Sequence, residues 1–188
     1  MKPVELLAEA GEFFVGRVVA VPADAWDNPT PCPGWTVRTA TAHVANGFSS
    51  IPAMIAGESM DLARRNEDRL GDDPVAALRA DLAACLTALQ QPGALDGMVA
   101  APAGIVPAAV LVAMRATDTI VHTWDVCTGA GIDASLPLDL VTAAAETFPE
   151  PALRSGRARG AFGPAVTVPA HADPQTAMLA RYGRSTEV

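Results

Sequence analysis

The segment that decides the fold is Arg115-Ala-Thr-Asp118-Thr-Ile-Val-His122-Thr-Trp-Asp125-Val126. Its apolar residues recur at helical spacing, so it predicts an α-helix. At about 100° per residue, Asp118 and His122 lie about 40° apart on one face of that helix, and Asp125 lies about 20° from Asp118. A carboxylate and a neutral imidazole on one helix face are two facial metal ligands that lack a third.

Periodic apolar residues predict helices in the rest of the chain as well. The expected helices are 3–20, 37–56, 74–91, about 107–128, 139–148 and about 173–182. Thr36 and Asp73 are good N-caps for the second and third of them. Four long helices favour an all-α fold, a four-helix bundle with a short helical and extended tail. We expect one domain over residues 1–188, with the bundle at about 3–130 and a C-terminal extension at about 131–188.

The segments between these helices predict no further regular structure. We expect a polar connector at 58–72 and an irregular Gly/Pro/Ala-rich stretch from 92 to 104. Pro149 should end the helix at 139–148. A small basic loop with Arg154, Arg157 and Arg159 should follow, and then an extended segment at 162–169.

Composition and charge exclude two broad classes of protein. The formal net charge is −8 and no run of basic residues could neutralise phosphates, so a general nucleic-acid binder is excluded. No apolar stretch reaches about 18 residues without a charge or a proline, so no membrane span is expected. The three cysteines show no C-x-x-C spacing and the N-terminus lacks the layout of a signal peptide, so we expect a cytoplasmic protein.

His43 is the best candidate for the third metal ligand. It lies beside the apolar stripe of the helix at 37–56, about 60° from it, and Gly47 leaves space one turn later. Two histidines and one carboxylate leave coordination positions open for water or a substrate. Zinc suits this set, and nickel, iron or manganese remain alternatives. The competing interpretation is that Asp118 and His122 form a surface i,i+4 pair and that His43 is a partly exposed histidine.

Other residues offer supporting roles or rival sites. Asp125 is expected to hold an imidazole N–H or to serve as an alternative ligand, unless it is simply a residue of the last helical turn. Arg38 or Arg115 could attract an anionic substrate. His171 would be a rival ligand, or a solvated loop histidine. Cys127 falls on the opposite helix face from Asp118, and no serine triad or phosphate loop is present.

Several motifs resemble one known family. They are Trp26-Asp-Asn-Pro-Thr30, Thr30-Pro-Cys-Pro-Gly-Trp-Thr-Val-Arg38, Ala42-His43-Val44, Val121-His122-Thr-Trp-Asp-Val-Cys-Thr-Gly-Ala-Gly131 and Phe162-Gly-Pro-Ala-Val-Thr-Val-Pro169. In this order and spacing they resemble the DinB-like metal-binding superfamily. Within it they are most similar to the actinobacterial proteins related to the N-terminal domain of mycothiol-dependent maleylpyruvate isomerase.

The resemblance implies a four-helix bundle that binds a divalent metal between its second and fourth helices, with His43, Asp118 and His122 as ligands. Related enzymes use zinc to present a low-molecular-weight thiol, such as mycothiol or bacillithiol, to an electrophile. Two departures stand out. The family's isomerase has glutamate where Asp118 stands, so this carboxylate is one methylene shorter. The usual Arg-Asp-Leu after the tryptophan is Arg38-Thr39-Ala40 here, which removes an acid.

Three functions follow as hypotheses. The first is a metal-dependent thiol transferase or isomerase whose partners are a small-molecule thiol and an electrophile. The second is a non-catalytic metal-binding protein that acts as a sensor, carrier or stress protein. The third is a helical interaction protein whose histidines are structural. The sequence assigns no catalytic residue and leaves a homodimer open.

Overall fold

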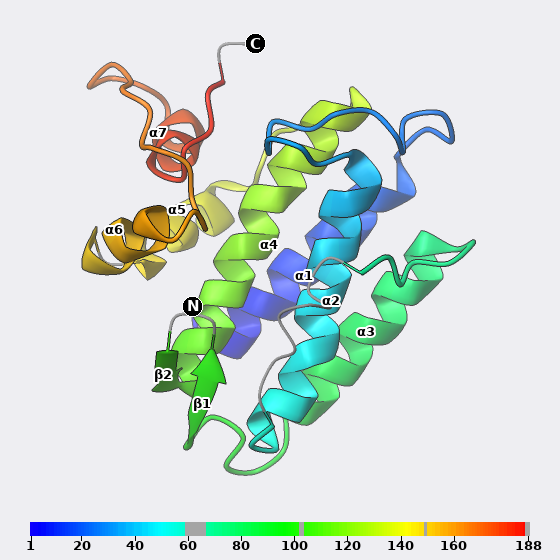
Figure 1. Cartoon of the computed structure of the whole chain (residues 1–188), viewed down its shortest axis with the longest axis vertical. Helices are drawn as coiled ribbons and strands as arrows, with labels where there is room; N and C mark the ends of the chain where they lie inside the picture. Colours follow the sequence, from blue (N-terminus) through cyan, green and yellow to red (C-terminus); the bar gives the residue numbers. More distant parts are fainter. Residues whose placement is uncertain (59–66, 102–103, 149, 187–188) are drawn as a thin grey trace.

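Four helices pack side by side as a bundle (Figure 1): α1 (Pro3–Val19), α2 (Val37–Ile55), α3 (Pro74–Leu89) and α4 (Ala108–Ala130). The computed structural model describes residues 1–58, 67–101, 104–148 and 150–186. Helix α1 contacts α3 and α4, and α2 contacts the same two helices. The four therefore enclose one apolar core, and the predicted all-α bundle is confirmed.

Hydrogen bonds confirm the two predicted N-caps, Thr36 of α2 and Asp73 of α3. The Thr36 hydroxyl accepts the Thr39 N–H at 3.2 Å, and the Asp73 carboxylate accepts the Ala76 N–H at 3.0 Å. These bonds satisfy backbone donors that the first helical turn leaves unpaired. Helix α4 ends at Gly131, whose φ of 67° is a left-handed conformation that favours glycine.

Helix α4 is the central element, because it contacts α1, α2, α5 and the β-hairpin. Its buried side chains include several polar ones. The threonine hydroxyls among them bond back to their own helix: Thr119 donates to the Arg115 carbonyl at 3.0 Å and Thr123 to the Thr119 carbonyl at 2.8 Å. These bonds let α4 keep polar residues inside the bundle without unpaired hydroxyls.

A β-hairpin corrects the expectation of an irregular stretch before α4. Strands β1 (Met98–Ala101) and β2 (Gly104–Pro107) pair antiparallel, with Val99 opposite Val106. Val99 is buried against the start of α4 and the end of α2. Each strand has only four residues, and their branched residues, Val99, Ile105 and Val106, stand among alanine, glycine and proline, so no run is long enough to predict a strand.

The C-terminal extension forms three short helices beside the bundle (Figure 1): α5 (Leu138–Thr147), α6 (Glu150–Ala158) and α7 (Pro174–Arg181). Helix α5 contacts α4 and α1, and α7 contacts α5. A cluster of three aromatic rings, with centroids 5.5–5.9 Å apart, holds this part together; its members are Phe148, Phe162 and Tyr182. The Tyr182 hydroxyl also donates to the Ala144 carbonyl of α5 at 2.7 Å.

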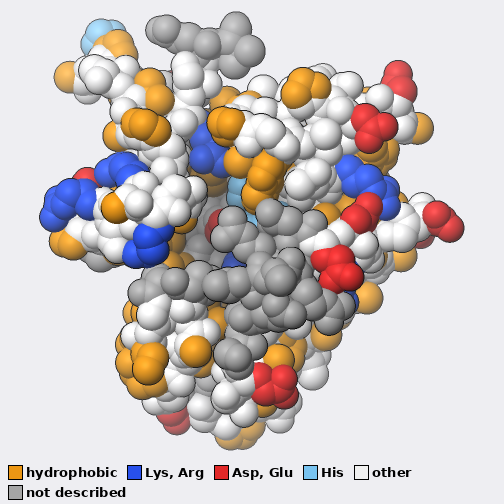
Figure 2. All heavy atoms as spheres, viewed as in Figure 1, with side chains coloured by type: hydrophobic (Ala, Val, Ile, Leu, Met, Phe, Trp, Pro, Cys, Tyr) orange, Lys and Arg blue, Asp and Glu red, His pale blue; other side chains and the backbone are white. Residues whose placement is uncertain are grey.

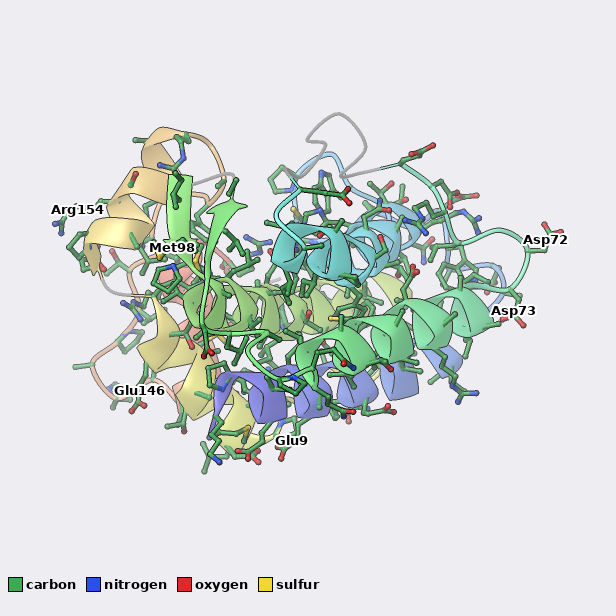
Figure 3. The ribbon with its side chains drawn as sticks, turned by 90° about the horizontal axis from the view of Figure 1, so that it is seen from below. Glu9, Asp72, Asp73, Met98, Glu146 and Arg154 are labelled. Atoms are coloured by element: carbon green, nitrogen blue, oxygen red, sulfur yellow. The ribbon has the colours of Figure 1, made fainter. Side chains whose placement is uncertain are left out.

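The expected basic loop was wrong, because Arg154 and Arg157 lie in α6. The helix forms there because Leu153 and Gly156 supply a buried face, and Phe162 packs where a side chain on Gly156 would stand. Arg159 lies in the turn that follows. Figure 3 shows Arg154 pointing away from the bundle.

Residues 162–169 join no strand pairing, although the Val166 N–H donates to the Ala180 carbonyl at 2.9 Å. Most of the expected connector at 58–72, and Pro149, lie outside the described residues. Among the described residues, no helix has both the length and the apolar character needed to cross a membrane.

The loop between α1 and α2 is fixed to the end of α4 through Gly129. The Asn28 amide donates to the Gly129 carbonyl at 3.2 Å. A Cβ on Gly129 would lie 2.8 Å from the Pro29 carbonyl oxygen, which is a backbone atom. The close approach of loop and helix therefore requires glycine at this position.

We expect Gly129→Ala to lower the free energy of unfolding by about 1–3 kcal/mol, because the added methyl group separates the loop from α4. The matched control is Gly16→Ala in α1, where nothing lies within 4 Å of the added Cβ. That control should raise the free energy of unfolding by about 0.5–1 kcal/mol through helix propensity. Urea unfolding of both variants measures the difference, and equal effects would contradict the assignment.

Candidate metal centre

The structure brings the three predicted ligands together between α2 and α4. His43 comes from α2, and Asp118 and His122 come from adjacent turns of α4. One ligand atom from each lies within 4.8 Å of the other two. His43 Nε2 is 3.2 Å from Asp118 Oδ2, and His122 Nε2 is 3.7 Å from Asp118 Oδ1. Among the described residues, no other group of three such side chains has this geometry.

These separations fit a single divalent cation. Zinc bonds to imidazole nitrogen and carboxylate oxygen measure about 2.0–2.2 Å, so two tetrahedral ligand atoms are separated by about 3.3–3.5 Å. The observed 3.2 and 3.7 Å, which are measured to different oxygens of the Asp118 carboxylate, lie on either side of that range. The donor set of two nitrogens and one oxygen also suits zinc and leaves open positions.

The cluster is only partly buried. His122 is buried, while the side chains of His43 and Asp118 are 13% and 28% exposed. Figure 2 shows a small patch of histidine surface near the centre of this face, with acidic and basic side chains beside it. The cluster is therefore partly exposed to solvent through His43 and Asp118.

Trp35 holds both imidazoles in place. Its ring stacks on His122 with centroids 5.2 Å apart and an angle of 15°, and its centroid is 4.8 Å from that of His43. Trp35 was not predicted to belong to the site. Its position just before the Thr36 cap was the available signal, since the α2 entry and His43 belong to one motif.

Asp125 bonds to His122 from the side away from Asp118. It accepts from His122 Nδ1 at 2.9 Å and is fully buried. Burial alone would raise the pKa of the Asp125 carboxyl. The hydrogen bonds from His122 and Arg184 lower this pKa by more, so the net shift is downward. An ionised carboxylate can only accept, so Nδ1 of His122 is the donor of this bond, and Nε2 is the ring nitrogen that faces Asp118. This is the arrangement that a role in orienting His122 requires.

Arg184 is the site neighbour that sequence reasoning missed. Its guanidinium, 8% exposed, donates to both Asp125 oxygens at 3.1 and 2.7 Å. The two residues are 59 positions apart, and no local pattern connects them. Arg184 also influences Cys32: burial raises the pKa of the Cys32 thiol, and the positive charge of Arg184 opposes that shift.

Arg115 contacts the cluster directly. Its Nη1 donates to Asp118 Oδ2 at 2.9 Å. Burial raises the pKa of the Asp118 carboxyl, but the cluster's two imidazoles and Arg115 lower it more, so it lies well below its usual range. Asp118 is therefore a carboxylate, the form that binds metal, at neutral pH.

Arg38, His171 and Cys127 are not part of the cluster. The Arg38 guanidinium donates to Asp68 at 2.6 Å and to the Gly71 carbonyl at 2.8 Å. His171 is exposed in a turn and is not a member of the three-residue group. Cys127 is buried, which raises its pKa to about 11, so it is protonated at neutral pH.

Comparison with known proteins points to one family. A family model for the mycothiol maleylpyruvate isomerase N-terminal domain matches residues 7–127, which include all three residues of the cluster. Two proteins of Mycobacterium tuberculosis are each 29% identical over 140 residues, or 74% of this chain and 74% of theirs. They are uncharacterized protein MT0763 of strain CDC 1551 / Oshkosh and uncharacterized protein Rv0738 of strain H37Rv.

The fold is similar to solved structures of one enzyme. A crystal structure of the mycothiol-dependent maleylpyruvate isomerase matches with a TM-score of 0.62 at 18% identity. The match covers 75% of this chain and 65% of that one, so the chain spans slightly less than two thirds of the isomerase's length. A histidine-to-alanine mutant of the isomerase matches with a TM-score of 0.61 at 18% identity, over 84% of this chain and 67% of that one. At this identity the likeness shows the fold.

We expect Asp125→Asn to cost about 3 kcal/mol of unfolding free energy at pH 7, because it leaves the buried Arg184 without its counter-ion. The folded-state pKa of Asp125 is below its unfolded value of about 3.9, so its stabilisation is complete above that pH and is lost as the pH falls further. Chemical denaturation at pH 7 and pH 3 should therefore show a smaller difference from wild type in acid. The control, Asp24→Asn in an exposed loop position, should change little at either pH.

Proposed function

The chain belongs to the family of the mycothiol maleylpyruvate isomerase N-terminal domain, and from this premise we propose that it is a metal-dependent thiol transferase or isomerase. The observation that carries the proposal is the convergence of His43, Asp118 and His122 from α2 and α4. These residues would hold a divalent cation, with zinc favoured by the donor set. Mycothiol or a similar low-molecular-weight thiol would be the cosubstrate, and an electrophile the second substrate.

The chemistry divides between the cation and the protein. A bound divalent cation lowers the pKa of a coordinated thiol, so that a thiolate nucleophile is present at neutral pH. Asp125 holds the Nδ1 proton of His122 and keeps Nε2 available as a ligand atom. Trp35 covers the two imidazole rings and fixes their planes. The exposed parts of His43 and Asp118 are where the thiol and the electrophile would reach the cluster.

A second candidate function is a non-catalytic metal-binding protein of the same fold, such as a sensor or stress protein. The observation that favours it is the ion pairing around the cluster. Asp118 pairs with Arg115, and Asp125 pairs with Arg184. None of these four groups is left as a general acid or base, so a reaction that needs one would have to draw it from the substrate or solvent.

Zinc binding tests the site. Isothermal titration of the metal-free protein should show one zinc ion per chain, and zinc should raise the melting temperature. His122→Ala should weaken zinc binding at least a hundredfold, because a bidentate set of His43 and Asp118 remains. The matched control is His171→Ala, which removes an exposed histidine and should leave the affinity unchanged. Equal zinc affinity in His122→Ala and the wild type would overturn the proposed site.

Turnover separates the two candidate functions. The zinc-loaded protein should consume mycothiol in the presence of an electrophilic substrate such as an epoxide, or isomerise maleylpyruvate with mycothiol present. Chelation of the metal should abolish either reaction, which product analysis by chromatography and mass spectrometry would measure. Tight zinc binding without turnover of any thiol–electrophile pair would favour the non-catalytic function. The cytoplasmic location and a homodimer stay predictions.

A further inference from the structure

Gly47 and Arg115 occupy one space between α2 and α4. A Cβ built on Gly47 would lie 2.7 Å from Arg115 Nη1 and 2.9 Å from both its Cδ and its Cζ. Gly47 is buried inside α2, and it is not among the glycines with positive φ. Its backbone is therefore one that alanine also adopts, and alanine would favour the helix more. What glycine supplies here is room for the arginine.

The seated guanidinium reaches the cluster from one side. Arg115 is 11% exposed, and its Nη1 donates to Asp118 Oδ2 at 2.9 Å. The same oxygen is 3.2 Å from His43 Nε2, while Oδ1 is 3.7 Å from His122 Nε2. Arg115 and His43 therefore both contact Oδ2 of the Asp118 carboxylate, whereas Oδ1 faces the imidazole of His122. Together these three contacts favour one side-chain conformation of Asp118.

We infer that Arg115 is the positioning residue for the Asp118 carboxylate, and that Gly47 serves the site by providing the space in which Arg115 sits. This inference rests on the proposed function only where it concerns metal affinity. In this role Arg115 binds Asp118 of the cluster and does not attract an anionic substrate. The arginine head group lies against α2 and bonds inward, so it is not presented as a recognition group.

The inference predicts that the two positions act as a unit. Arg115→Ala should weaken zinc binding by about tenfold or more, the size of effect that loss of a residue supporting a ligand produces. Gly47→Ala should weaken it to a similar extent, because its methyl group expels the guanidinium. The double variant should bind zinc no more weakly than Arg115→Ala alone, because the space is then empty.

The experiment is this double-mutant cycle, measured by zinc titration and by the melting temperature of the metal-free proteins. If Gly47→Ala folds poorly, the double variant should recover a melting temperature close to that of Arg115→Ala. The matched arginine control is Arg17→Ala, which removes a surface pair with Asp133 and should leave zinc affinity unchanged. Multiplicative losses of affinity in the double variant, or wild-type affinity in Arg115→Ala, would overturn the inference.

A crystal structure of metal-free Arg115→Ala provides a readout that does not depend on zinc. The Asp118 carboxylate should rotate away from His43, and an unchanged side-chain conformation would overturn the positioning role. If the wild type binds no zinc, the proposed function fails, whereas this structure and the melting temperatures still decide whether Gly47 and Arg115 hold Asp118.

Discussion

The buried ion pair between Asp125 and Arg184 is the interaction on which the rest of the site depends. A carboxylate with no exposed surface is costly inside a helical bundle unless a cation and hydrogen bonds compensate it. Arg184 supplies that compensation from the C-terminal extension, where the aromatic cluster around Tyr182 fixes its position. The bundle and its extension therefore share one electrostatic constraint, and His122 takes its orientation from it.

Around this pair, the molecule places polar side chains where small residues leave space for them. Gly129 lets the loop that carries Trp35 approach α4, and Gly47 lets Arg115 lie beside Asp118. In both cases the neighbour is within 3 Å of a Cβ that glycine lacks. Small residues at these contacts therefore let α2 and α4 lie close enough for His43 to meet Asp118 and His122.

How much the sequence predicts depends on how local each interaction is. Helical spacing was sufficient to pair Asp118 with His122, and local chemistry was sufficient for the caps at Thr36 and Asp73. The hairpin at 98–107 was missed because its strands have only four residues each and include alanine, glycine and proline. Arg184 could not be found, because its partner lies 59 residues away and buried ion pairs leave no periodic pattern. The sequence indicated that Gly47 leaves space one turn after His43, but it did not show that Arg115 fills this space.

The charge balance explains why Arg184 is needed when a cation is held. Once Nε2 of His122 serves as a ligand atom, as proposed, the imidazole is neutral and its Nδ1–H is only a hydrogen-bond donor. Asp125 must then be balanced by Arg184 alone. The same reasoning applies to Asp118, where Arg115 remains when His43 becomes a neutral ligand, so each carboxylate has an arginine whose charge does not depend on metal binding.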